Sequence, residues 1–343
     1  MAAFPKTRTS AQKQESIFER ILNYKQFGLI VALILLGLLA KFITPAMYQP
    51  ASLVAMLRNN SIYAILAIGE MVVILTGGID ISIASTLSLS GVISTTLMTQ
   101  NPSVPAIVWV IVSLAIGALC GLFNGFLIGK LKMTPMIATL ATMYIYRGLA
   151  FLISGGVWLF PNKFTEDFTV MSQGSILGIY NITWITIILF LVAGVFLSYT
   201  QPGRRIYAVG TNVESAHVSG IKIGNVTVMS YVLCGALSGL AGVLYTANYS
   251  ICYYGIADGF EMQAIAICVL GGVSLIGGTG RIDGVVIGAV LMSVISYFIG
   301  LLPGLSVWQD AIQGAIIIVA VAINIFTERM TIKRILKERG AMI

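Results

Sequence analysis

The sequence predicts an all-α, polytopic membrane protein with about ten transmembrane helices, and three observations support this fold class. Hydrophobic residues make up 57% of the 343-residue chain and charged residues only 10%, whereas soluble domains carry roughly 25% charged residues. Apolar stretches of about 20 residues, the length that crosses the bilayer core, recur along the chain. The 36 glycines suit helices that pack closely in lipid. This composition excludes an ordinary soluble enzyme and a disordered chain.

Ten apolar stretches are expected to span the membrane. The first follows a polar segment, residues 1–26, and has no small-residue cleavage site of the signal-peptide kind. The predicted spans are 27–43, 61–78, 81–99, 104–130, 134–154, 182–199, 226–247, 261–277, 283–302 and 311–327. The chain thus divides into an N-terminal cytoplasmic segment (1–26), a membrane domain (27–327) with a cytoplasmic loop (200–225), and a C-terminal cytoplasmic tail (328–343).

The basic residues set the expected orientation. Ten spans with both termini inside place 16 of the 20 lysines and arginines on the cytoplasmic side, as the positive-inside rule requires. One span fewer or more would put the basic loop 200–225 or the C-terminal tail on the wrong side. The net charge of +7 is therefore interpreted as a signal of topology, and no nucleic-acid partner is expected.

Motifs for catalysis and metal binding are missing from the sequence. The four cysteines have no paired spacing, and the one histidine, His217, cannot form a metal cluster. The string nearest to a phosphate-binding loop, 125–131, has the wrong spacing and no hydroxyl. We expect a non-catalytic chain that binds no metal and no cofactor of its own.

Glycines form regular faces on two predicted spans. Gly117, Gly121 and Gly125 recur every four residues on the fourth span, and Gly235 and Gly239 do so on the seventh. Such faces allow backbones to pack directly against each other. The strings GALCGL (117–122) and GALSGL (235–240) are near copies on spans of opposite predicted direction. They indicate either an inverted repeat, as in many transporters, or independent selection of small residues for packing.

Polar residues inside or beside the spans are candidates for a solute pathway, because such groups usually face a bundle interior or a wet cavity. The candidates are Glu70, Asn124, Arg147, Asn248 and Gln263. An ion pair between Glu70 and Arg147 is an equally good interpretation. Turn or packing roles are expected for a second set, comprising Gly77, Gly78, Asp80, Gly271, Gly272 and Asp283.

The loop after the sixth span contains a short helix in our prediction. Pro202 and Gly203 are expected to end the span, and the string TNVE (211–214) is typical of a capping box. The helix would end near Gly220. A short amphipathic helix between two long spans has the shape needed to dock into another protein, although a helix that merely lies at the membrane interface is the alternative.

Four strings make the chain resemble the permease subunits of bacterial ATP-binding-cassette importers, in the branch for ribose, xylose, rhamnose and autoinducer-2. They are LTGGIDISIAS (75–85), IATLATMYIYRGL (137–149), GRRIYAVGTN (203–212) with SGI (219–221), and AICVLGGVSLIGGTG (266–280). Together, in this order and spacing, they are specific and cover most of the chain. His217 and the pair Ile83-Ala84 depart from the usual pattern.

The resemblance implies an importer permease fold and an ATP-driven mechanism. Two permease chains, identical or different, would form the pathway, and two cytoplasmic ATPase subunits with ATP and Mg²⁺ would drive it. An external binding protein would deliver a simple sugar or a sugar-like molecule. The residues implied to couple the chain to its ATPase are Arg204, Arg205, Gly210, Thr211, Asn212, Glu214, Ser215, Ala216 and Gly220.

An ion-coupled secondary transporter of a small neutral solute is the alternative function. Glu70 and Asp80 could carry ions in such a protein, but few further carboxylates lie within the predicted spans. A membrane scaffold without transport activity is a third class, for which no feature of the sequence argues.

Overall fold

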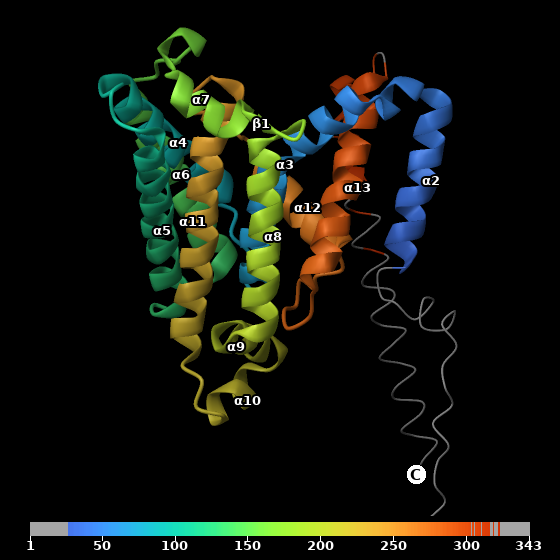
Figure 1. The fold of residues 1–343 in the computed structure, drawn as a ribbon. Helices are drawn as coiled ribbons and strands as arrows, with labels where there is room; N and C mark the ends of the chain where they lie inside the picture. The colour runs from blue at the N-terminus through green and yellow to red at the C-terminus, as the bar shows by residue number, and fades with distance from the viewer. Residues whose placement is uncertain are drawn as a thin grey trace, which may run out of the picture.

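A computed structural model describes residues 27–302, 304, 306–309, 311–315, 318 and 322. The chain is a helical bundle with a cap of short elements at one end and a protruding helical loop at the other (Figure 1). The helices are α2 (Phe27–Ile43), α3 (Pro50–Ile74), α4 (Ile83–Gln100), α5 (Ala106–Gly129), α6 (Pro135–Ser154), α7 (Glu166–Gln173), α8 (Asn181–Tyr199), α9 (Gln201–Thr211), α10 (Val213–Val218), α11 (Ile223–Tyr249), α12 (Phe260–Leu270) and α13 (Ile282–Leu301). The remaining elements are three 3-10 turns, η1 (Pro45–Tyr48), η2 (Pro161–Lys163) and η3 (Ser306–Trp308), and two strands, β1 (Ser175–Ile176) and β2 (Ile179–Tyr180).

The all-α membrane fold is confirmed. Six described helices are long and apolar enough to cross a bilayer, namely α3, α5, α6, α8, α11 and α13. Helices α2 and α4 coincide with two further predicted spans, and α12 covers the first part of the eighth. The tenth, 311–327, lies mostly outside the described residues, as do the N-terminal segment 1–26 and the tail 328–343.

Two predicted spans end in the wrong places. The second, expected over 61–78, begins at Pro50 and stops at Ile74, because proline suits the first helical turn, which needs no amide donor there. The eighth, expected over 261–277, is helical only to Leu270. Gly271 and Gly272 follow, and Gly272 has a positive φ of 79°, a conformation that ends helices. An irregular segment, 271–281, therefore replaces the last two turns.

Helix α4 is buried on almost every side although it is rich in serine and threonine. Ser85, Ser88, Ser90 and Ser94 are fully buried. The hydroxyls of Ser90 and Ser94 donate to the carbonyls of Thr86 and Ser90 at 2.7 Å. These bonds satisfy the hydroxyls within the helix itself, and Ser88 Oγ donates to Tyr254 O at 2.6 Å, so α4 can occupy the centre of the bundle.

Helices α5 and α11 pack antiparallel through the glycine faces identified in the sequence. A Cβ on Gly117 would overlap the carbonyl oxygen of Gly235, and one on Gly121 would overlap that of Tyr231. A Cβ on Gly125 would lie 2.8 Å from the Cα of Val228. The two backbones are in direct contact, so any larger residue here must push the helices apart.

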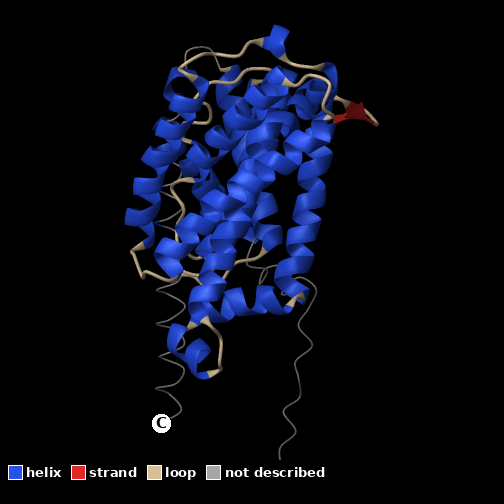
Figure 2. Cartoon of the chain, turned by 90° about the vertical axis from the view of Figure 1, so that its left-hand side faces the viewer, coloured by secondary structure: helices blue, strands red, loops and turns tan. Residues whose placement is uncertain are grey.

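The two ends of the bundle carry different charges. The helices alternate in direction, so that the turn 130–134, the segment 200–222 and the segment 271–281 lie at the end marked by α9 and α10 (Figure 1). Lys130, Lys132, Arg204, Arg205, Lys222 and Arg281 belong to these segments. Helix α7 and the β1–β2 hairpin cover the opposite end (Figures 1 and 2). These basic connections therefore share one end of the bundle, as the positive-inside rule requires of loops on one side of the membrane.

Candidate functional site

Helix α9 lies across one end of the bundle and touches two irregular segments that connect spanning helices. These segments are 75–82, between α3 and α4, and 271–281, between α12 and α13. Its buried residues Gly203, Ile206 and Val209 recur every three residues and face the bundle. The opposite face carries Arg204 and Arg205, which are exposed. This amphipathic pattern explains why the helix lies flat on the bundle instead of continuing α8.

The contact between α9 and these segments is made by backbone. Gly278 N donates to the Leu75 carbonyl at 2.9 Å. Gly210 packs directly against the donor and the acceptor of this hydrogen bond. A Cβ on Gly210 would overlap both Leu75 O and Gly278 N, and one on Gly277 would lie 2.9 Å from Gly77 N. We call Leu75, Gly77, Gly210, Gly277 and Gly278 the glycine junction. It joins α9 to the connection between α3 and α4 and to the connection between α12 and α13.

Two side chains of α9 reinforce the junction. The Tyr207 hydroxyl donates to Gly280 O at 2.8 Å, and burial raises the pKa of this tyrosine, which keeps the hydroxyl a neutral donor. Thr211 Oγ1 lies 3.5 Å from Gly278 O and donates to Tyr207 O at 2.8 Å. A displacement of α9 is therefore transmitted to residues 278–280.

Helix α10 protrudes beyond α9 at the same end (Figures 1 and 2). Only Ala216 is buried, while Val213 is 54% and Val218 83% exposed. Glu214 and Ser215 are exposed beside them. The two exposed valines on this protruding helix are accessible to another surface.

The predicted capping box is wrong by one residue. Thr211 is the last residue of α9, and Asn212 caps α10 instead, its Oδ1 accepting from Ser215 N at 2.7 Å. The sixth span ends at Tyr199, as its predicted bounds of 182–199 require. Pro202 and Gly203 lie in the first turn of α9, where proline is well accommodated.

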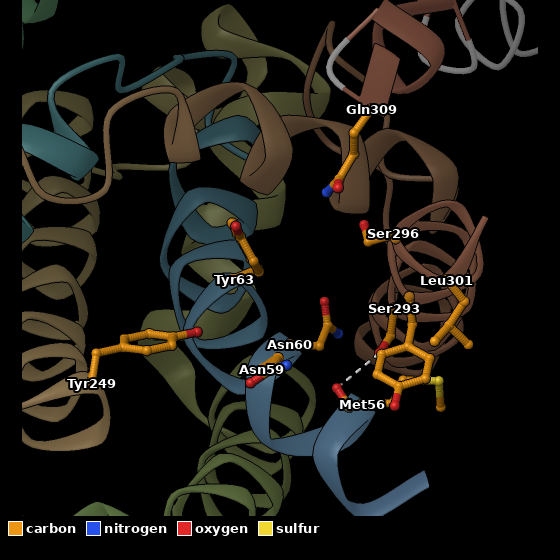
Figure 3. A pocket seen from close by; sticks show the side chains of 11 residues that line it. Met56, Asn59, Asn60, Tyr63, Tyr249, Ser293, Ser296, Leu301 and Gln309 are labelled. Carbon is orange, nitrogen blue, oxygen red and sulfur yellow. Dashed lines mark hydrogen bonds between the residues drawn. The ribbon is translucent and has the colours of Figure 1, made fainter. Parts of the chain in front are cut away.

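A polar groove of about 380 Å³ opens toward the end of the bundle opposite α9. Helices α3 and α13 form its walls, and Tyr249 and Gln309 point into it from α11 and from beyond α13 (Figure 3). Its polar lining residues are Asn59, Asn60, Tyr63, Tyr249, Ser293, Ser296, Tyr297 and Gln309. No charged residue lines it among the described residues, so the groove offers amides and hydroxyls to a neutral ligand.

Hydrogen bonds between α3 and α13 hold the walls of the groove together. Asn60 Nδ2 donates to Ala289 O at 2.7 Å, and Ser293 Oγ donates to Met56 O at 3.1 Å (Figure 3). These residues were not predicted, because the candidates were ionisable and amide groups within or beside the predicted spans and hydroxyl groups were not considered. The signal was present in Asn59 and Asn60, which lie outside the predicted second span, and in Ser293 and Ser296, one helical turn apart.

Two of the predicted pathway residues, Glu70 and Asn124, lie instead in a buried cluster of hydrogen-bonded polar groups with Asp80 and Ser82, which we call the buried knot. Glu70, Asp80 and Asn124 are each at most 2% exposed. Asp80 accepts from Ser82 N and Oγ at 2.9 and 2.6 Å, and its own amide donates to Glu70 Oε1 at 3.1 Å. Asn124 Nδ2 donates to Ser82 Oγ at 2.7 Å. The knot fixes segment 75–82 against α3, α4 and α5.

Comparison with known proteins assigns the chain to a family. Residues 52–321 match the family described as branched-chain amino acid transport system / permease component. The chain belongs to this permease family. The match covers most of the sequence, including the glycine junction, the buried knot and all the residues that line the groove.

Individual relatives are similar over nearly their whole length. The ribose import permease protein RbsC of Escherichia coli K12 is 35% identical over 298 residues, which are 86% of this chain and 92% of the relative. RbsC of Bacillus subtilis 168 is 36% identical over 88% of this chain and 92% of its own. The autoinducer 2 import system permease protein LsrC of Shigella flexneri is 33% identical over 90% and 89%. No solved structure matches the chain.

The other predicted pathway residues of the permease lie apart from the groove. Arg147 donates to Tyr254 O at 3.1 Å and Ile256 O at 2.8 Å, and pairs with Asp258 at 3.3 Å. An ion pair of Arg147 with Glu70 is therefore wrong, since Arg147 reaches the segment before α12 instead. Gln263 is half-buried on α12.

Asn248 lies at the end of α11, near the groove, where it is hydrogen-bonded to Arg58. Its Oδ1 accepts from Arg58 Nε at 2.6 Å and its carbonyl accepts from Arg58 Nη2 at 2.8 Å. The Arg58 guanidinium also lies 4.4 Å from the centre of the Tyr180 ring, a cation–π contact. Arg58 thus joins α3, the end of α11 and strand β2, and holds the groove's neighbouring elements in place.

The turn residues of the permease lie at the α9 end. Gly77 has a positive φ of 81°, and a Cβ on Gly78 would lie 2.7 Å from the Tyr231 hydroxyl. A Cβ on Gly271 would lie 2.7 Å from the Gly284 backbone. Asp283 pairs with Arg281 at 3.0 Å in the first turn of α13. All four described cysteines are free and buried.

Proposed function

We propose that this permease is the membrane subunit of an ATP-driven importer and forms the translocation pathway for a simple sugar or a sugar-like molecule of the ribose, rhamnose or autoinducer-2 type. The chain itself is non-catalytic in this proposal. ATP and Mg²⁺ are bound by separate cytoplasmic ATPase subunits, a second permease chain completes the pathway, and an external binding protein delivers the solute. The protein spans the bacterial cytoplasmic membrane many times, with both termini in the cytoplasm.

The observation that carries the proposal is the connection from α10 to the glycine junction. Helix α10 exposes Val213 and Val218, which suits docking into a groove of a partner protein. Helix α9 precedes it, separated from it by Asn212 alone, and meets Leu75 and Gly278 through backbone atoms. A movement of the docked ATPase therefore displaces segments 75–82 and 271–281, and with them the ends of α3, α4, α12 and α13.

The groove supports a neutral, hydroxyl-rich solute. Sugars are bound through many hydrogen bonds to hydroxyls and amides, and the groove presents Asn59, Tyr63 and Ser296 among its lining groups. Its volume of about 380 Å³ lies within the range of pockets that hold small molecules, about 300–1,000 Å³. The family's description names branched-chain amino acids, but a zwitterionic amino acid would bring charges that the described lining does not match.

The assembly is tested by mild-detergent purification of the full-length chain from native membranes, followed by mass spectrometry. We expect an ATPase subunit at about one copy per permease chain. In Glu214→Lys, which reverses the charge on α10, the ATPase should be lost while membrane insertion is retained. Glu166→Lys, an exposed charge reversal at the opposite end on α7, is the matched control and should keep the ATPase. Recovery of the chain without any ATPase, even after gentle cross-linking, would overturn the proposal.

The ion-coupled transporter is retained as a second candidate because of one observation. Glu70 and Asp80 are both buried, and no salt bridge reaches either carboxylate within the described residues. Buried carboxylates of this kind can carry protons or sodium ions in transporters. Collapse of the proton and sodium gradients would abolish uptake by such a protein, whereas the ATP-driven importer should be unaffected.

A further inference from the structure

A second cavity lies at the α9 end of the permease, on the outer side of α9 and away from the glycine junction. Its volume is about 700 Å³. Helix α9 provides one wall, and the first turns of α11 with the segment before them provide the other. The residues used in the argument are Arg204, Arg205, Lys222, Ile221, Val226 and Met229, all of which line the cavity.

The cavity is strongly basic. Arg204, Arg205 and Lys222 line it, and no acidic residue does among the described residues. Arg204 uses one nitrogen to donate to Tyr199 O at 3.2 Å and keeps its other donors. The side chains of Arg205 and Lys222 make no hydrogen bond or ion pair within the part of the chain that the structure describes. Three cations that share one cavity repel each other unless an anion lies between them.

The other lining groups and the position of the cavity indicate a membrane ligand. Ile221, Val226 and Met229 contribute apolar surface beside the cations. Helix α8 approaches the same end with exposed apolar side chains at Leu191, Val192 and Val195, which are 57–66% exposed, and such a stripe is expected to face lipid. The stripe ends at Tyr199, immediately before α9 begins. The cavity therefore lies at the level where acyl chains give way to headgroups.

We propose that this cavity binds the phosphate headgroup of an anionic phospholipid. The two guanidinium groups can bind phosphate oxygens through paired N–H donors, and the Lys222 ammonium adds a point charge. The apolar wall of Ile221, Val226 and Met229 contacts the glycerol backbone and the start of an acyl chain. A soluble anion would use the cations but not this wall. An acidic surface of a partner protein is the competing macromolecular occupant.

The test counts lipids bound to the full-length chain by native mass spectrometry in detergent that contains phosphatidylglycerol or phosphatidylcholine. Phosphatidylglycerol should be retained and phosphatidylcholine should not. Arg205→Gln and Lys222→Gln should each weaken phosphatidylglycerol binding on the order of fivefold, as expected for one surface cation. The matched control is Lys132→Gln, which removes an exposed charge from the same end of the bundle but does not line the cavity. It should leave binding unchanged.

Four results would overturn the proposal. Equal loss in Lys132→Gln would show general electrostatic attraction instead of a site, as would equal retention of the two lipids. Displacement of phosphatidylglycerol by millimolar inorganic phosphate alone would assign the cavity to a soluble anion, and displacement by added ATPase subunit would assign it to an acidic protein surface. The lipid count requires neither ATP nor solute, so its failure is distinguishable from failure of the proposed transport function.

Discussion

The groove at one end of the bundle and the glycine junction at the other differ in the atoms that they present. The groove between α3 and α13 presents side-chain amides and hydroxyls around about 380 Å³ of open space. The glycine junction makes its contacts through backbone atoms and leaves no space, because Gly210 packs against the hydrogen bond between Gly278 N and Leu75 O. The groove has room for a ligand, whereas the junction is a direct contact between backbones.

This difference predicts different tolerance to mutation. Interiors packed at high density cannot absorb even one added methyl group without strain. A groove lined by half-exposed polar side chains can accept substitutions that keep its volume, and loses affinity instead of stability. Substitutions at the junction should therefore damage folding and coupling together, whereas substitutions in the groove should affect solute binding alone.

The largest effect is expected for Gly210→Ala. The new Cβ would overlap Leu75 O and Gly278 N, so α9 must move away from both segments. We expect a loss of about 1–3 kcal/mol in the free energy of unfolding, as for other overpacked sites, and ATP hydrolysis that no longer produces uptake. Thermal unfolding and uptake in proteoliposomes measure the two effects. Gly148→Ala is the control, since nothing lies within 4 Å of a Cβ there; equal behaviour of the two variants would contradict the account.

A loss of stability without a direct effect on the groove is expected for Asn124→Ala. Asn124 connects Ser82 with Tyr146, whose hydroxyl donates to Asn124 Oδ1 at 3.2 Å. Removal of a buried hydrogen-bonding partner costs about 1–3 kcal/mol, measurable as a lower midpoint of thermal unfolding. The exposed Asn101→Ala should unfold like the wild type. An unchanged midpoint for Asn124→Ala would mean that the knot does not hold segment 75–82.

The groove is probed by Asn59→Leu, which nearly conserves volume but removes the amide. Asn59 is exposed and lines the groove, so stability should not change. One lost hydrogen bond to the solute should raise the KM of uptake about five- to tenfold. Asn101→Leu, at the same end of the bundle but outside the groove, should leave KM unchanged. A normal KM for Asn59→Leu would place the pathway elsewhere.

The smallest effect is expected for a substitution on α7, the helix that covers the end of the bundle opposite the glycine junction. Asp167 on α7 accepts from Ala106 N at 2.9 Å and so connects α7 to the first residue of α5. A hydrogen bond from the Thr165 side chain is the main cause that lowers the pKa of Asp167, and the Ala106 and Phe168 amides add to it. A lowered pKa means that the ionised carboxylate stabilises the fold above its unfolded pKa, about 3.9, and that this contribution disappears as the pH falls through the folded value.

The difference in unfolding midpoint between the wild type and Asp167→Asn should therefore be small near pH 7, because the group is exposed. It should shrink below about pH 4 and vanish once the pH is below the folded pKa of Asp167. Midpoints measured across this pH range test it. A difference that grows as the pH falls would contradict the assigned sign.

Most of the fold could be predicted from the sequence, but less of the candidate site. Long apolar stretches determine where helices cross the membrane, and glycines at intervals of four indicate close packing, so α5 and α11 followed from local patterns. The groove did not, because Asn59 and Ser293 are distant in sequence and meet only when α3 packs on α13. The partner of Arg147 could not be predicted for the same reason: Asp258 and Glu70 were both available, and tertiary packing decides between them.

The central claim, that ATP hydrolysis drives this chain, is tested most directly by solute uptake in proteoliposomes that contain the permease, its ATPase and its binding protein. Ribose is the first solute to measure. The account predicts uptake that stops when the ATPase is inactivated and continues when proton and sodium gradients are collapsed by ionophores. Uptake that persists without ATPase activity and stops with the gradients would contradict it, and would assign the buried Glu70 and Asp80 to ion coupling.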